Sequence, residues 1–256
     1  MNEPRRNVLV FRVVAAMWLV GWYWKAWYIG EYFLSEIWSY RVHYAGLPSV
    51  LVHPAVVTVA WLAPALAALA IVMPRRWTMR AASMVITASA FIGCLHFETF
   101  YDATFVTSFW AGLWLSWFAA NIERTDAAFL LHARVLAQCT VGLVFLGGAV
   151  GKLTGAYLTN GDALFHLYLQ QKPNWPYPWL RDTLSPTTLH TLALWFSRGT
   201  VGIELLLSLC PLMPSRIAAI GAIFVITAMV VVSTFFLMSV MACLLGLLVA
   251  VLLLRE

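Results

Sequence analysis

The stretch VLAQCTVGLVFLGGAVG, from Val135 to Gly151, is an almost unbroken apolar run that only Gln138 and Thr140 interrupt. Lys152 follows directly and is one of three lysines in the 256 residues. A run of this kind is typical of a helix that crosses a lipid bilayer, which needs about 20 apolar residues. A lysine where hydrocarbon meets water is costly unless it reaches the interface, forms an ion pair or has a function.

The composition indicates an integral membrane protein. Hydrophobic residues make up 62% of the chain and charged residues 11%, whereas a soluble domain carries about 25% charged residues. The formal net charge of +5 comes from arginines between apolar segments, which indicates membrane topology and no nucleic-acid partner. The four cysteines are scattered without a C-x-x-C pair, so neither a disulfide framework nor a thiolate metal site is predicted.

Other apolar stretches predict about eight spans in all, at roughly residues 8–30, 51–73, 81–101, 104–121, 133–152, 189–212, 217–234 and 236–254. The last two form one apolar block that is longer than a bilayer is thick. The chain either turns near Ser233 and Thr234 or continues as one tilted helix, which would leave one span fewer. We expect an all-α polytopic membrane helical bundle that forms a single transmembrane domain over residues 1–256.

Basic residues orient these spans, because loops rich in arginine and lysine stay in the cytoplasm. On one side lie Arg5, Arg6, Arg75, Arg76, Arg80, Arg124, Arg134, Arg216 and Arg255. The other side carries Arg41, Lys172 and Arg181. We therefore expect both termini in the cytoplasm and Lys152 at the outer boundary.

The long connection over residues 153–188 is predicted to be a structured outer loop, partly re-entrant. Its prolines predict no regular helix through 173–186. Its aromatic residues make a freely solvated loop unfavourable. We expect Trp175 and Trp179 to close the outer mouth of the bundle. Together with His166, on the segment that follows Lys152 most closely, they are the candidate cofactor-binding residues at this mouth. Long structured loops of this kind often carry function.

Lys152 is the first candidate for a chemical centre. A carboxylate beside it would keep it charged, whereas burial without one would make it a base. Glu98 and Asp102 are expected near the same outer end and are the candidates for tuning Lys152. His96 and Glu98 resemble half a metal site, but residues two apart point to different faces of a helix, so no metal site is predicted.

Arg198 and Glu204 lie well inside the sixth span and are predicted to be structural. Six residues place them about 240° apart around one helix, so they are not expected to pair with each other. Each needs a partner elsewhere. Arg12 or a backbone carbonyl is the expected partner of Glu204, because both are placed towards the inner side.

These features resemble the horizontally transferred transmembrane (HTTM) domain, the membrane portion of vitamin K-dependent gamma-glutamyl carboxylase and of many bacterial proteins. The resemblance begins at Phe11-Arg12 and is strongest over FLGGAVGKL, Phe145 to Leu153, followed by Tyr157 and Gly161. GIELL, Gly202 to Leu206, and then Ser215-Arg216 are similar to the family's later helix with its acidic residue.

The resemblance implies that Lys152 matches the lysine that deprotonates vitamin K hydroquinone, and that a quinone or hydroquinone is the expected cofactor. It also implies a bacterial inner membrane location. The chain departs from the carboxylase pattern at two positions: Tyr101-Asp102-Ala103-Thr104 contains no histidine, and Thr227 stands where the later helix has one. The substrate-gripping region of the carboxylase has no counterpart in this sequence.

Two functions therefore stay open. The chain is expected to be a non-catalytic subunit or maturation factor of a membrane complex, with lipid and other membrane subunits as partners. The alternative is a quinone-linked membrane enzyme in which Lys152 is the base. A transporter is a weaker third hypothesis, because no inverted repeat is visible.

Overall fold

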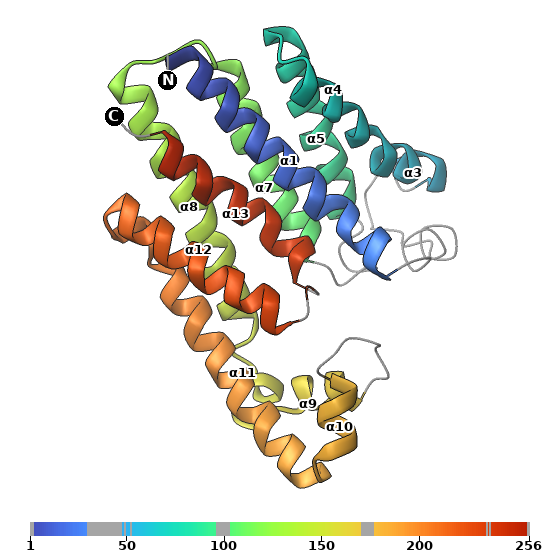
Figure 1. The fold of residues 1–256 in the computed structure, drawn as a ribbon. Helices are drawn as coiled ribbons and strands as arrows, with labels where there is room; N and C mark the ends of the chain where they lie inside the picture. The colour runs from blue at the N-terminus through green and yellow to red at the C-terminus, as the bar shows by residue number, and fades with distance from the viewer. Residues whose placement is uncertain are drawn as a thin grey trace. The chain divides into compact units, whose positions relative to one another are not determined.

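The computed structural model describes residues 3–29, 48, 50, 51, 53–95, 103–169, 177–233, 235 and 237–254. Every regular element in this described part is a helix (Figure 1), which confirms the all-α prediction. The chain divides into two compact units. Unit 1 comprises Met1–Ala137 with Met238–Glu256, and unit 2 comprises Gln138–Leu237. That both belong to a single transmembrane domain stays a prediction.

Unit 1 is built around its first helix, α1. Its elements are α1 (Glu3–Ile29), α3 (Pro54–Leu62), the 3-10 turn η1 (Ala63–Leu66), α4 (Ala67–Val72), α5 (Arg76–Leu95), α7 (Ala103–Ala120), the first part of α8 (Ala127–Gly151) and α13 (Met238–Leu253). Helix α1 packs against α13 and α7, and α5 packs against α7 (Figure 1). A Cβ on Gly246 would lie 3.0 Å from the Cβ of Met17, so this glycine lets α1 and α13 approach closely.

The second apolar segment is kinked at Pro64. This proline has no backbone N–H to donate, and the chain passes through η1 between α3 and α4. The indole of Trp22 donates a 3.0 Å hydrogen bond to the carbonyl of Trp61. The Tyr23 hydroxyl shares its one hydrogen between the carbonyls of Trp61 and Leu62, each at 3.1 Å. Neighbouring side chains thus satisfy backbone groups at the kink, as a helix in lipid requires.

Two arginines cap the ends of neighbouring helices in unit 1. Arg12 donates from Nε to the carbonyl oxygen of Ile71, at 2.7 Å, at the end of α4. Arg80 donates from Nη2 to the carbonyl oxygen of Ala120, at 2.6 Å, at the end of α7. The last carbonyls of a helix have no partner inside the helix and carry its partial negative charge. These contacts therefore supply both a hydrogen bond and a favourable charge.

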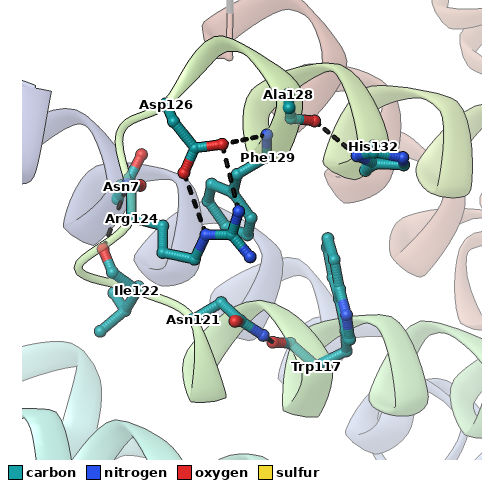
Figure 2. A network of polar contacts seen from close by, with 9 residues as sticks. All are labelled: Asn7, Trp117, Asn121, Ile122, Arg124, Asp126, Ala128, Phe129 and His132. Atoms are coloured by element: carbon teal, nitrogen blue, oxygen red, sulfur yellow. Dashed lines mark hydrogen bonds and ion pairs between the residues drawn. The ribbon is translucent and has the colours of Figure 1, made fainter.

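Side chains of α1 and of the turn itself hold the turn between α7 and α8 in place (Figure 2). The buried Asn7 of α1 donates from Nδ2 to the carbonyls of Ile122, at 2.9 Å, and Arg124, at 2.8 Å. Asp126 accepts from the backbone N–H of Phe129 at 2.9 Å, which makes it the N-cap of α8. The same carboxylate accepts two hydrogen bonds from the Arg124 guanidinium, at 3.0 and 3.1 Å.

This turn is expected to make stability depend on pH. The hydrogen bonds from Arg124 and from the Phe129 N–H lower the pKa of Asp126. A lowered pKa adds stability above the pKa of the unfolded chain, and that stability is lost as the pH falls through the folded-state value. We expect Asp126→Asn to unfold at a lower temperature than the unmodified chain at about pH 6, and the gap to close towards about pH 3. Thermal unfolding midpoints in mild detergent measure this, and a gap that is constant with pH would contradict it.

Unit 2 is built around α11. It contains the second part of α8, the short π-helix η2 (Gly155–Thr159), α9 (Asp162–Leu169), α10 (Tyr177–Thr183), α11 (Pro186–Ser208), the 3-10 turn η3 (Cys210–Leu212) and α12 (Ser215–Val232). Helix α11 packs against η2 and α9, and α9 also contacts α10. Gly142 of α8 would place a Cβ 2.7 Å from the ring of Pro211, so only a residue without a side chain fits there.

Membrane spans are supported for six of the described helical segments, which are long and apolar enough to cross a bilayer: Arg5–Trp24, Pro54–Val72, Arg76–Leu95, Ala127–Gly151, Pro186–Leu212 and Ser215–Val232. Helix α7 is not among them, and α13 is an apolar helix of 16 residues, shorter than the roughly 20 residues of a typical span. The count of eight and the orientation of the termini stay predictions.

The long apolar block near the C-terminus forms two helices. Helix α12 ends at Val232 and α13 begins at Met238. Phe235 between them has a φ of 63°, which no helix interior allows for a bulky residue. The predicted turn near Ser233 is therefore confirmed, and the alternative of one long tilted helix is wrong.

The connection over residues 153–188 is helical in much of its described part. It folds into η2, α9 and α10 before α11 begins. The prediction that prolines exclude a regular helix through 173–186 is wrong for Tyr177–Thr183. Pro178 lies in the first turn of α10, where a missing N–H breaks no helical hydrogen bond. The placement of the connection over residues 153–188 on the outer side, partly re-entrant, stays a prediction.

Candidate functional site

Lys152 forms an ion pair with Glu204 inside unit 2. Its Nζ lies 2.7 Å from Oε1 and 2.9 Å from Oε2 of the carboxylate. A third contact, at 3.3 Å, joins Nζ to the carbonyl oxygen of Gly148. The side chain of Glu204 is 8% exposed and that of Lys152 is 25% exposed. The structure therefore places a carboxylate beside Lys152, which is one of the two arrangements that the sequence left open.

The glycines before Lys152 make room for this pair. Gly148 lies one helical turn before Lys152, and a Cβ added there would be 3.3 Å from Oε2 of Glu204. A side chain at this position would press on the carboxylate. Gly147 and Gly151 face open space, with nothing within 4 Å of an added Cβ. Of these three glycines, only Gly148 shapes the site.

The Lys152–Glu204 pair corrects two expectations about Glu204. Its partner is Lys152, whereas Arg12 instead caps the end of α4. Lys152 was expected at the outer boundary and Glu204 towards the inner side, yet the ion pair places them at the same level. Glu204 lies roughly 27 Å along α11 from Pro186, at 1.5 Å per residue. The first part of α11 therefore extends past the end of α8 and packs on η2 and α9.

Polar residues continue along the same face of α11. His190, Ser197 and Glu204 are seven residues apart in turn, which places them on one side of the helix. His190 Nε2 lies 3.0 Å from Oδ1 of Asp162. Ser197 is fully buried, and its hydroxyl has no hydrogen-bond partner among the described residues. Of these three residues only Glu204 was predicted as a site residue, although the seven-residue spacing is present in the sequence.

Two residues of the 155–162 segment interact with α11, and one of them, Tyr157, lies near the charge of Glu204. Burial raises the pKa of Tyr157, and the negative charge of Glu204 raises it further. Arg198 donates from Nε to the carbonyl of Leu158 at 3.0 Å, and its guanidinium lies 5.6 Å from the ring centre of Trp195. Arg198 and Glu204 were predicted not to pair with each other, and each has a different partner in the structure.

Of the remaining candidate site residues, the structure describes only His166 and Trp179. Glu98, Asp102 and Trp175 lie outside the described residues, so their predicted roles stay predictions. His166 lies in the last turn of α9 and is exposed. Trp179 of α10 is 54% exposed. Among the described residues, no hydrogen bond or ion pair joins His166 or Trp179 to Lys152, and no three His, Cys, Asp or Glu side chains gather as metal ligands.

The helices and their composition define the class of this protein: it is an integral membrane protein made of apolar helices. Comparison with models of known protein families, with curated proteins and with solved structures finds no match to the chain.

Proposed function

We propose that this chain is a non-catalytic subunit or maturation factor of a membrane complex, with an HTTM-like fold. The observation that carries the proposal is the contact of Lys152 with both carboxylate oxygens of Glu204. The pair joins the end of α8 to the last third of α11 and supports a structural role for Lys152. The partners of the chain in this proposal are the lipid bilayer and other membrane subunits.

The geometry at Nζ supports a charged, structural lysine. A lysine ammonium has three N–H donors and no acceptor. Its three acceptors here are the two oxygens of Glu204 and the carbonyl of Gly148. A base needs a free amine lone pair, so Lys152 would have to leave this arrangement before it could take a proton from a hydroquinone.

The second candidate is a quinone-linked enzyme with Lys152 as the base. It is favoured by the 25% exposure of the Lys152 side chain, which leaves part of that side chain reachable from outside the protein. The similarity of FLGGAVGKL to the carboxylase motif supports the same candidate. We propose an inner membrane location in a bacterium, on the strength of the HTTM-like motifs. The arginine distribution supports the proposal that both termini lie in the cytoplasm.

Lys152→Arg separates the two functions. Arginine keeps the positive charge for Glu204 but stays protonated in proteins, so it cannot act as a base. The unmodified chain and this variant are purified in mild detergent, and copurifying proteins and small molecules are read by mass spectrometry. We expect the same stoichiometric protein partner in both preparations. A bound quinone whose turnover disappears in Lys152→Arg would overturn the proposal in favour of the enzyme.

A further inference from the structure

A groove of about 430 Å³ opens along the first turns of α1. Arg5 and Arg12 line it, together with Val8 and Leu9 between them. Arg5 and Arg12 are seven residues apart, so they lie on the same face of the helix. Two arginines and two aliphatic residues therefore line one groove.

The two arginines differ in how they are held. Arg12 donates from Nε to the carbonyl of Ile71, at 2.7 Å, and from Nη2 to that of Val72, at 3.3 Å. These bonds fix the plane of its guanidinium and leave Nη1 without a described partner. Arg5 is exposed and has no hydrogen bond or ion pair among the described residues. Two like charges in one groove repel each other, and an anion between them would relieve that repulsion.

We infer that this groove binds the headgroup of an anionic phospholipid of the surrounding bilayer. The first candidate span begins at Arg5, so the groove lies where a headgroup meets its acyl chains. A guanidinium matches the geometry of a phosphate group with two parallel hydrogen bonds. Basic sites at the ends of membrane helices recognise anionic lipids in this way. This inference does not depend on the proposed function.

The aliphatic residues distinguish a lipid from a free anion. Val8 is partly buried and Leu9 is 36% exposed, and both line the groove beside the arginines. Inorganic phosphate or a phosphorylated metabolite has no surface that would cover them. The first methylene groups of an acyl chain would cover them and remove apolar area from the aqueous interface.

Native mass spectrometry of the full chain in a neutral detergent tests the inference. Dioleoylphosphatidylglycerol is the anionic probe, and dioleoylphosphatidylcholine is the matched lipid with no net charge. We expect the unmodified chain to prefer phosphatidylglycerol, and Arg5→Gln to weaken that binding about fivefold without changing the binding of phosphatidylcholine. Arg75→Gln is the control, because it removes an exposed positive charge that does not line the groove.

The possible results distinguish binding of the lipid in the groove from attraction of the lipid by net positive charge. Equal losses in Arg5→Gln and Arg75→Gln would show that net charge alone attracts the lipid and would overturn the inference. Complete displacement of phosphatidylglycerol by glycerol 1-phosphate would show recognition of the phosphate alone and would also overturn it. As a second readout, phosphatidylglycerol should raise the thermal unfolding midpoint of the unmodified chain more than that of Arg5→Gln. Because Arg5 is exposed, its replacement leaves the packing of α1 in place.

Discussion

Replacing Lys152 with alanine is expected to lower the free energy of unfolding by about 3 to 5 kcal/mol, as for other broken buried ion pairs. The variant leaves the carboxylate of Glu204 without its cation, and that side chain is 8% exposed. The lost lysine also removes the contact with the carbonyl of Gly148. Denaturant titration of the purified chain in mild detergent, followed by tryptophan fluorescence, measures the change.

A double variant separates the loss of pairing from the loss of packing. Lys152→Met combined with Glu204→Leu removes both charges and keeps apolar side chains of similar size. Replacing both partners of a buried pair by apolar residues is often neutral, so we expect this variant to recover most of the stability lost in Lys152→Ala. A Lys152→Ala chain as stable as the unmodified protein would show that the pair does not hold α8 to α11.

Gly161→Ala is expected to destabilise unit 2 by about 2 to 5 kcal/mol, from a strained backbone and a steric clash together. Gly161 has a φ of 76°, a conformation that residues with a Cβ rarely adopt. An added Cβ would lie 2.6 Å from Cα and 2.7 Å from N of Leu194. These are backbone atoms of α11, so no side-chain rotation relieves the clash.

The measurement for Gly161→Ala is the thermal unfolding midpoint together with the rate of proteolysis in the connection over residues 153–188. Gly155→Ala is the matched control, because nothing lies within 4 Å of an added Cβ there. We expect the control to behave like the unmodified chain. Equal midpoints and equal cleavage rates for both variants would contradict the close contact of the 160–162 turn with α11.

Hydropathy predicted the helices well because each apolar helix in lipid must satisfy its own backbone. The run that ends at Lys152 is one such helix, and the break near Ser233 follows from the thickness of a bilayer. The number of prolines was less informative about α10, because the position of Pro178 within its helix matters more than how many prolines lie nearby.

The pairing of Lys152 with Glu204 could not be read from hydropathy. The two residues are 52 positions apart, and their contact depends on how far α11 extends past α8. Assigning each residue a depth from its own span placed them at opposite sides of the membrane. The useful signal was that two isolated ionic residues in apolar helices each needed a partner, and Gly148 left the space in which they meet.

The arginine caps of unit 1 have a consequence for how the sequence can drift. Arg12 and Arg80 bond to main-chain oxygens of Ile71 and Ala120, which every amino acid supplies. Substitutions of the side chains at those two acceptor positions therefore leave the bonds available, whereas loss of either arginine removes them. These hydrogen bonds therefore tolerate substitution of the residue that supplies the carbonyl, but not of the arginine. Across related sequences, they would appear as a constant arginine opposite a variable apolar position, a pattern that paired substitutions cannot reveal.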